Sequence, residues 1–334
     1  MAFKIAAYGV RENEIESFHD LNKYSYDLKL IPENLTHENV QTAQGCDAVL
    51  LRGNNVGDQQ NLDQLKEYGI KYVFTRTVGF NHIDLKAAQN NQQLVAYVPG
   101  YSPLSVSELA FTLGLTLQRH IALATSRTAR GDFKVHTDEF ATEIHDLTIG
   151  IIGTGRIGRE EAALWKGVNA TVVGFDRYPS DANQDLLTYV DEDELLSRSD
   201  IVSLHVPYFP DSNHHYFNQS YIDKMKNGAI LVNTARAEIT DVSAILDAVE
   251  TGKLTGFATD VVENEGRIFG HDFAGQPTED DLADRALRLY PKVIMTPHIG
   301  SYTREALHDM IAISYENFND VLTTGSSKNL LAAK

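Results

Sequence analysis

The chain has 334 residues, more than one ordinary hydrophobic core accommodates, so its length predicts two domains. Its 43% hydrophobic and 22% charged residues are typical of a soluble, globular protein. The formal net charge of −17 argues against nucleic acid or a membrane as a partner, because nucleic acids and anionic membranes both bind clusters of Lys and Arg. The single cysteine, Cys46, excludes an internal disulfide and a cysteine metal cluster, and we expect no metal.

The beginning of the chain does not have the pattern of a targeting segment. The apolar run within residues 1–14 is too short for a signal peptide, and polar residues follow it at once. No stretch of the sequence approaches the length of a membrane span. We therefore expect a cytoplasmic protein.

Strand-like and helix-like segments alternate in the first part of the chain. Residues 4–8, 47–51 and 72–75 are apolar runs that predict strands, and the polar stretch 61–68 is compatible with a helix. This alternation is typical of a parallel sheet with helices on both faces. Two prolines and a glycine in residues 98–103 then interrupt the pattern, as expected at a hinge or crossover.

The next segments have the character of a contact between domains or subunits. From Ser105 to residue 123 the sequence predicts a helix with apolar residues on most of its faces, which indicates burial between domains or at a subunit contact. The polar, mixed segment 125–143 that follows is expected to be an arm that reaches a partner subunit.

Residues 148–176 predict a strand, a glycine turn, a helix and a second strand that ends at an acidic residue. Gly153, Gly155 and Gly158 form G-x-G-x-x-G, and Asp176 lies 18 residues after the last glycine. The glycines allow a tight turn, close approach of a pyrophosphate and close helix packing, while the acid can accept hydrogen bonds from ribose hydroxyls. The pattern predicts a dinucleotide site; the alternative is a structural turn of a doubly wound sheet.

The glycine motif begins near the middle of the chain, so a separate unit precedes it. Further strands are predicted at 201–205, 229–233, 257–259 and 293–296, with helices such as 192–196 and 242–251 between them. A helix over about 303–324 returns to the first unit. The predicted fold class is α/β with two doubly wound parallel-sheet domains: a Rossmann cofactor domain (102–299) inserted into a flavodoxin-like substrate domain (1–101 and 300–334).

Side chains with chemical capability follow the predicted strands at the sheet edge where ligands bind. Arg236 follows 229–233, the acids Asp260, Glu263 and Glu265 follow 257–259, and His298 follows 293–296. Each residue alone is more often an ordinary loop or solvated side chain. A guanidinium, carboxylates and an imidazole on the same edge as a dinucleotide turn together predict a catalytic site.

Motifs over essentially the whole chain resemble the NAD-dependent D-2-hydroxyacid dehydrogenases. They are the glycine motif, NTARAEITD (233–241), DVVENE (260–265) and TPHIGSYT (296–303). RTVGFNHID (76–84) and VPGYSPLSVSE (98–108) are similar to the D-lactate dehydrogenase branch, in which LLRGNN (50–55), TSRTARGDFKV (125–135) and HIGSYT are most similar to the (R)-2-hydroxyglutarate dehydrogenases. The resemblance implies that Arg236, Glu265 and His298 are catalytic, that Asp260 contacts the nicotinamide side, and that the protein is a homodimer joined through its cofactor domain.

The side-chain chemistry agrees with reversible reduction of a 2-oxo acid. An imidazole titrates near neutral pH, so His298 suits the proton transfer, and Glu265 would favour the imidazolium and fix its tautomer. Arg236 can bind the 1-carboxylate and polarise the carbonyl. Backbone N–H groups of Val78 and Gly79 are expected to bind the other carboxylate oxygen.

NAD is the expected cofactor, because Asp176 would repel the 2′-phosphate of NADP. Arg177 follows it directly and could partly offset that repulsion, so use of NADP stays open. The expected cofactor contacts are Gly153, Thr154, Gly155, Arg156, Ile157, Gly158, Asp176, Val206, Pro207, Thr234, Ala235, Arg236, Asp260 and His298.

The expected substrate contacts leave the choice of 2-oxo acid open. Tyr101 resembles a substrate-facing tyrosine of the lactate branch, and Ser301 stands where pyruvate-reducing relatives carry a bulky aromatic residue. Arg52, after strand 47–51, could pair with a second carboxylate, which favours 2-oxoglutarate over pyruvate or a larger aliphatic or aromatic 2-oxo acid. The alternatives of another class are a non-catalytic NAD-binding regulator, a methyltransferase and a flavoprotein, none of which needs the Arg, Glu and His together.

Overall fold

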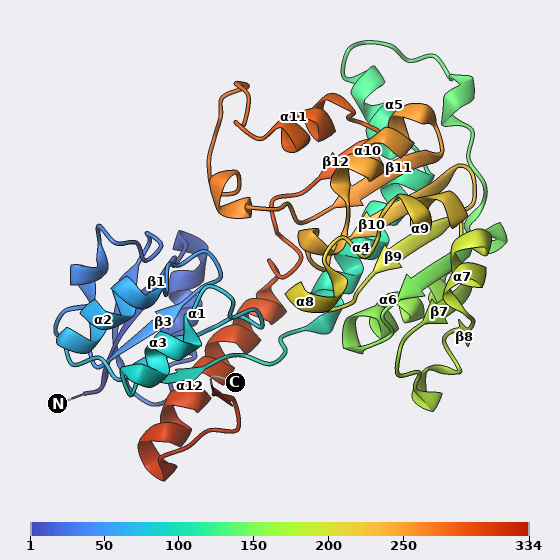
Figure 1. Ribbon diagram of the computed structural model, residues 1–334. Helices are drawn as coiled ribbons and strands as arrows, with labels where there is room; N and C mark the ends of the chain where they lie inside the picture. The colour runs from blue at the N-terminus through green and yellow to red at the C-terminus, as the bar shows by residue number, and fades with distance from the viewer. Residues whose placement is uncertain (1, 333–334) are drawn as a thin grey trace. The chain divides into compact units, whose positions relative to one another are not determined.

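The computed structural model describes residues 2–332, which divide into two compact units (Figure 1). Unit 1 contains the residues up to Ser102 and those from Ser301 onward, and unit 2 is Pro103–Gly300. The outer limits expected for the substrate domain, Met1 and Lys334, lie outside the described residues. Because the chain enters unit 2 and then returns, unit 2 is an insertion within unit 1.

Unit 1 is built on a sheet with the strand order β13-β5-β4-β3-β1-β2. Neighbouring strands run parallel except at one edge, where β13 is antiparallel to β5. The strands are β1 (Lys4–Tyr8), β2 (Asp27–Ile31), β3 (Ala48–Leu51), β4 (Tyr72–Thr75), β5 (Leu94–Ala96) and β13 (Leu330–Leu331). The α-helices are α1 (Ile15–Asp20), α2 (Gln59–Glu67), α3 (Leu85–Asn90) and α12 (Arg304–Thr324).

Alternating side chains of the central strands form two hydrophobic cores in unit 1. Ile5 and Leu50 pack with residues of α1 and α12 on one face, whereas Val49 packs with α2 and α3 on the other. The rings of Phe74 and Phe318 stack at 4.3 Å between centroids and join the sheet to α12. A strand that is buried on both faces reads as a continuous apolar run, which is why β1, β3 and β4 were detectable in the sequence.

Unit 2 is built on a parallel sheet with the strand order β12-β11-β10-β9-β6-β7-β8 (Figure 1). Its strands are β6 (Thr148–Ile152), β7 (Thr171–Phe175), β8 (Thr188–Tyr189), β9 (Ile201–Leu204), β10 (Ala229–Asn233), β11 (Leu254–Thr259) and β12 (Val293–Met295). Its α-helices are α4 (Pro103–Gln118), α5 (Ile121–Thr128), α6 (Arg156–Gly167), α7 (Glu192–Arg198), α8 (Pro210–Asn213), α9 (Gln219–Lys224), α10 (Val242–Thr251) and α11 (Asp281–Arg288).

Helices cover both faces of the unit 2 sheet. Residues of α4 and α6 pack on one face around the buried Trp165, and residues of α7, α9 and α10 pack on the other. The strand order reverses between β6 and β9, which are neighbours although a crossover through β7 and β8 separates them in sequence. Open parallel sheets bind ligands beyond the carboxyl ends of the strands at such a reversal.

The structure differs from the sequence predictions mainly at edges and helix ends. The expected helix from Ser105 is two helices, because His120 takes a left-handed conformation (φ 51°) between α4 and α5. Strands β2, β5, β8 and β13 were not predicted. No helix in residues 2–332 is both long enough and apolar enough to cross a membrane.

A half-buried histidine in unit 1 gives a testable dependence of stability on pH. The Nε2 atom of His82 is buried without a hydrogen-bond partner among the described residues, and burial lowers the pKa of this imidazole to about 4. The unfolded chain binds the proton below pH ~6.5, so the contribution to stability is complete above that pH and is lost as the pH falls towards 4.

We expect the His82→Gln variant to lose less unfolding free energy than the parent chain between pH 7 and pH 5. Between pH 7 and pH 5 the unfolding free energy of the parent chain should fall by roughly 2 kcal/mol more than that of the variant. Urea unfolding followed by circular dichroism at the two pH values measures it. An equal pH dependence of both proteins would contradict the burial argument.

Candidate active site

The glycine turn of unit 2 joins β6 to α6. Gly153 has φ +92°, and a Cβ atom there would lie 2.7 Å from the backbone carbon of His205. At Gly158 a Cβ atom would lie 2.1 Å from the oxygen of Gly153, so a side chain would push α6 away from the turn. A Cβ on Gly155, in contrast, would meet no atom within 4 Å. The turn is therefore closed on its protein side and open above Gly155, where the N-terminus of α6 favours an anion.

Asp176 follows β7 and is tied to the same turn. One carboxylate oxygen accepts a hydrogen bond from the backbone N–H of Thr154 at 2.7 Å, and the other accepts from the N–H of Tyr178 at 2.9 Å. The first oxygen also lies 3.3 Å from the Thr154 hydroxyl, so the second oxygen keeps the lone pair with which Asp176 can accept from a ribose hydroxyl. The acid expected to bind ribose thus belongs to the glycine turn structurally.

A cavity of about 400 Å³ lies beside the turn. Five of the expected cofactor contacts line it: Gly153, Gly155, Asp176, Val206 and Pro207. The sequence analysis did not assign its other lining residues to the cofactor site: Ile152, Phe175, Arg177, Tyr178, His205, Phe209, Asn213 and Tyr216. An aromatic, proline-rich loop directly after β9 was the signal that would have identified several of them.

The polar groups of this region fit a dinucleotide. The Thr234 hydroxyl, after β10, is buried and has no hydrogen-bond partner among the described residues, so it is available to a ligand. Asn213 is already engaged, because its amide donates to the oxygen of Pro207 at 2.7 Å and fixes the loop that lines the cavity. The open turn, the acid at the end of β7 and the mostly apolar cavity provide sites for phosphate, ribose and adenine respectively.

His298 and Glu265 form a pair on the carboxyl side of the sheet. His298 follows β12 in a left-handed conformation (φ 52°), and its Nδ1 lies 2.8 Å and 3.0 Å from the two carboxylate oxygens of Glu265. An ionised carboxylate can only accept, so Nδ1 carries the hydrogen and Nε2 is directed to other partners. The imidazole is 41% exposed and therefore accessible to a substrate.

Asp260 holds the loop that presents His298. Its buried carboxylate accepts hydrogen bonds from the Thr296 hydroxyl at 2.6 Å and from the N–H groups of Ile299 and Gly300 at 2.8 Å each. Burial raises the pKa of Asp260, and these hydrogen bonds oppose the rise. We expected Asp260 as a cofactor contact only; the structure adds this positioning role, which no sequence signal indicated.

Arg236 follows β10 in a turn that the Asn233 side chain braces. The Asn233 amide accepts from the N–H of Ala235 and donates to the oxygen of Arg236, each at 3.0 Å. The guanidinium donates one hydrogen bond, to the oxygen of Ala235 at 2.7 Å, and among the described residues it has no acidic partner. Its remaining N–H groups are therefore free to bind an anion. The structure shows no hydrogen bond or ion pair between Arg236 and the His298–Glu265 pair within the described residues.

Arg52 belongs to a cluster of arginines at the carboxyl ends of β1, β3 and β4 in unit 1. Burial, followed by the charges of Arg11 and Arg76, lowers the pKa of Arg52 to about 10. The carboxylate of Glu14 is paired instead with Arg76 at 2.8 Å and with Arg11 at 3.6 Å. No described residue forms an ion pair or a hydrogen bond with the Arg52 guanidinium, so the cluster has an excess of positive charge.

The other expected substrate contacts also lie in unit 1. Val78 is exposed, and neither its N–H nor that of Gly79 has an acceptor among residues 2–332. The side chains of Tyr101 and Ser301 are partly buried. Each unit therefore presents anion-binding groups: Arg52 and the backbone at residues 78–79 in unit 1, and Arg236 in unit 2.

The glycine turn, the imidazole–carboxylate pair and the arginine are groups that a nicotinamide-dependent oxidoreductase can use, and unit 2 carries all of them on a doubly wound sheet. The pattern of the D-isomer specific 2-hydroxyacid dehydrogenases, NAD binding domain, matches residues 111–300. An aromatic 2-oxoacid reductase of Clostridium sporogenes is 35% identical over 99% of this chain and 100% of its own length, and a D-lactate dehydrogenase of Lactiplantibacillus plantarum is 36% identical over 97% and 98%. The solved structure of a D-lactate dehydrogenase from Treponema pallidum superimposes with a TM-score of 0.89 at 33% identity, covering 99% of this chain and 100% of that one.

The chain belongs to the D-isomer specific 2-hydroxyacid dehydrogenase family. It is an NAD-dependent oxidoreductase with two parallel-sheet α/β domains. Membership of this family favours a dehydrogenase over a regulator, a methyltransferase or a flavoprotein. It also confirms NAD as the expected cofactor.

Proposed function

We propose that the protein reduces 2-oxoglutarate to (R)-2-hydroxyglutarate with NADH, reversibly. The observation that carries the choice of substrate is the unpaired guanidinium of Arg52 within a positively charged cluster of unit 1. The motif LLRGNN (50–55), similar to the (R)-2-hydroxyglutarate dehydrogenases, contains this arginine. 2-Oxoglutarate has the second carboxylate that this guanidinium can bind.

His298, Glu265 and Arg236 divide the catalytic work. NADH, when bound, would supply a hydride to the carbonyl carbon. His298 gives the proton on its Nε2 to the carbonyl oxygen as negative charge develops there, and Glu265 stabilises the imidazolium before that transfer. Arg236 binds the 1-carboxylate and stabilises the negative charge on the carbonyl oxygen. After the proton transfer the substrate is an alcohol and the imidazole of His298 is neutral. Oxidation of the hydroxy acid runs through the same contacts in reverse.

Arg52 favours a second carboxylate for an energetic reason. Burial and two neighbouring arginines disfavour its charged form, as the lowered pKa of about 10 indicates, yet the group remains charged near pH 7. A bound carboxylate relieves this repulsion and satisfies the N–H groups of the guanidinium with charge-assisted hydrogen bonds. A methyl or aromatic substrate side chain would leave the same charge without a partner, which is costly.

The relatives named for pyruvate-type or aromatic substrates define the competing proposal. Steady-state kcat/KM for NADH oxidation should be measured with 2-oxoglutarate, oxaloacetate, pyruvate, 2-oxoisocaproate and phenylpyruvate. We expect 2-oxoglutarate to have the highest value. A higher kcat/KM with pyruvate or phenylpyruvate would assign the chain to D-lactate dehydrogenase or aromatic 2-oxoacid reductase activity instead.

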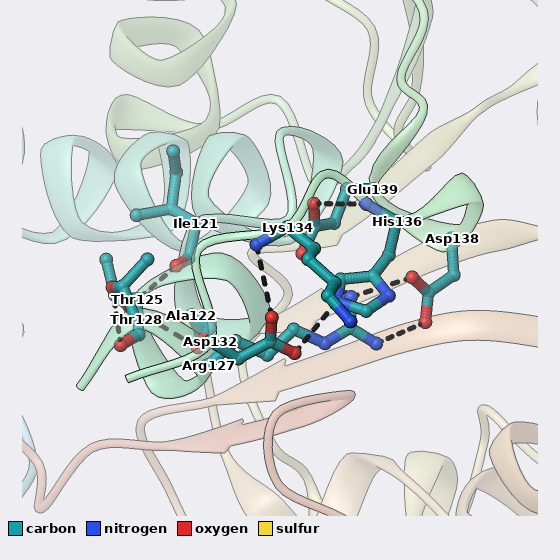
Figure 2. Close-up of polar contacts among 10 residues, drawn as sticks. All are labelled: Ile121, Ala122, Thr125, Arg127, Thr128, Asp132, Lys134, His136, Asp138 and Glu139. Atoms are coloured by element: carbon teal, nitrogen blue, oxygen red, sulfur yellow. Dashed lines mark hydrogen bonds and ion pairs between the residues drawn. The ribbon is translucent and has the colours of Figure 1, made fainter. Parts of the chain in front are cut away.

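We further propose a homodimer formed through α5 and the arm 129–143 of unit 2. No residue of α5 is buried, and Phe133, Val135 and Phe140 are 80%, 94% and 91% exposed. Figure 2 shows that the arm is nevertheless ordered by ion pairs: Arg127 binds Asp138 and Glu139, each at 2.7 Å. A fixed segment with large apolar side chains in water is the expected form of a subunit contact.

We expect the Val135→Asp variant to sediment as a monomer, because a charge at a buried apolar contact opposes association. Sedimentation velocity at micromolar concentration measures the change. Leu287→Asp is the matched control, since Leu287 on α11 is 53% exposed outside the arm, and we expect it to leave the dimer intact. A dimeric Val135→Asp variant would contradict this interface.

A further inference from the structure

The Tyr189 hydroxyl lies at the centre of a hydrogen-bond network behind the glycine turn. It accepts hydrogen bonds from the N–H of Ser180 at 3.1 Å and from the Asn183 amide at 2.9 Å, and it lies 2.8 Å from the Thr154 hydroxyl. The second hydrogen of the same Asn183 amide binds the oxygen of Thr154 at 3.0 Å. Thr154 and Asn183 are 5% and 3% exposed, so bulk water does not replace these contacts.

The direction of this network is determined by its donors. Since two N–H groups already occupy the lone pairs of Tyr189, its own hydrogen is donated to the Thr154 hydroxyl. The Thr154 hydrogen is then donated to Asp176, whose oxygen lies 3.3 Å away. The chain runs from Asn183 through Tyr189 and Thr154 and ends at a carboxylate, an order in which each hydrogen bond polarises the next.

We propose that Tyr189 is a specificity-determining positioning residue for the dinucleotide. Acting through Thr154, its hydroxyl keeps the Asp176 carboxylate where the remaining lone pair of its other oxygen accepts from a hydroxyl of the adenosine ribose. The proposal rests on the dinucleotide site assigned above and is independent of the 2-oxo acid. It identifies a role in cofactor choice for β8, a two-residue edge strand that pairs with β7 at Gly174.

Arg177 is the reason why this fixation matters. It is exposed, it lines the same cavity, and its guanidinium is a suitable partner for a 2′-phosphate. If the Asp176 carboxylate were free to rotate, it would move away from the ribose, and Arg177 would then bind the 2′-phosphate of NADPH. A carboxylate held by Thr154 cannot move away, so a 2′-phosphate meets its negative charge at short range.

The experiment is a fluorescence titration of the full-length protein with NADH and with NADPH, in the absence of a 2-oxo acid. For Tyr189→Phe we expect the Kd for NADH to rise about 3- to 10-fold, the loss that one net hydrogen bond carries, with a smaller change for NADPH. The ratio of the Kd for NADPH to the Kd for NADH therefore falls. We expect kcat at saturating NADH to stay unchanged, because His298 and Glu265 lie outside this network.

A double-mutant cycle separates the relay from general destabilisation. Thr154→Val removes the next hydroxyl, and the double variant with Tyr189→Phe should be no worse than either single variant, because both break one chain. The matched control is Tyr221→Phe, which removes a hydroxyl hydrogen bond of 3.0 Å to Glu192 in the same unit, and we expect it to leave the Kd ratio unchanged.

Three results would overturn the proposal in distinguishable ways. If Tyr189→Phe leaves the ratio of Kd values unchanged while Asp176→Ala abolishes the preference for NADH, the relay is wrong and the dinucleotide site stands. If Asp176→Ala also leaves that preference intact, the site assignment itself is wrong. Additive effects of Tyr189→Phe and Thr154→Val would likewise contradict transmission through Thr154.

Discussion

His298→Ala is expected to lower kcat for 2-oxo acid reduction by about 10²- to 10⁴-fold, the range that loss of a general acid produces. The KM for NADH should change less than kcat, because the proton that His298 donates goes to the 2-oxo acid. The physical reason is the missing proton donor: without an imidazolium the developing alkoxide must take its proton from water. Stopped-flow single turnovers with NADH in excess measure the chemical step directly.

The chain provides a matched control for this prediction. His215 also pairs with a carboxylate, since its Nε2 lies 2.8 Å from Glu263, and its imidazole is 41% exposed like that of His298. We expect His215→Ala to retain the parent kcat. Glu265→Gln should retain measurable activity but shift the alkaline limb of the kcat–pH profile for 2-oxo acid reduction to lower pH, because the imidazolium that donates the proton loses its partner. Near-normal turnover of His298→Ala would remove this residue from the role of general acid.

Arg52→Ala is expected to lower kcat/KM for 2-oxoglutarate about 10- to 100-fold, the effect of one charge-assisted hydrogen-bonded pair. The kcat/KM for pyruvate should stay nearly constant, because pyruvate has no second carboxylate. The ratio of the two values is therefore the quantity to measure. It reports on the distal group of the substrate and is insensitive to a uniform loss of active protein.

Two further variants, Arg11→Ala and Arg52→Lys, are compared with Arg52→Ala. Arg11→Ala removes a charge of the same cluster that is already paired with Glu14 and lies 4.3 Å from the ring of Tyr302, so we expect a smaller and less selective effect. Arg52→Lys should recover part of the preference, since it restores the charge without the planar pair of donors. An equal loss on both substrates after Arg52→Ala would argue for a structural role and against the dicarboxylate proposal.

The elements that the sequence predicted are those buried on both faces or bounded by strong signals. β1, β6 and β10 are continuous apolar runs inside a sheet, and α10 ends at Gly252, which takes the left-handed conformation (φ 80°) that glycine favours. The strands that were missed lie at edges or are very short. β13, for example, consists of two residues paired with β5, and such pairing depends on a partner more than 200 residues away in sequence.

The candidate site was predictable where its chemistry requires a particular residue type at a particular place in the sequence. The glycine turn and Asp176 follow from spacing and His298 from its place after a strand, whereas the choice of Glu265 over Glu263 came from the family resemblance. The contacts that fix them were not predictable, because they join segments that the sequence does not mark. Tyr189 on β8 and Asn183 shortly before it bind Thr154 from a segment with no motif, and Asp260 binds backbone N–H groups that any sequence would supply.

The way in which Asp260 supports the catalytic loop has a consequence for changing the substrate range. Its carboxylate holds the N–H groups of residues 299 and 300, and backbone donors persist when side chains are exchanged. Position 300 is the restricted one, since a Cβ there would lie 3.0 Å from the carboxylate. Ile299 and Ser301 are therefore suitable positions for randomised libraries. The hydrogen bonds between Asp260 and the loop that carries His298 persist while the side chains beside the imidazole are changed.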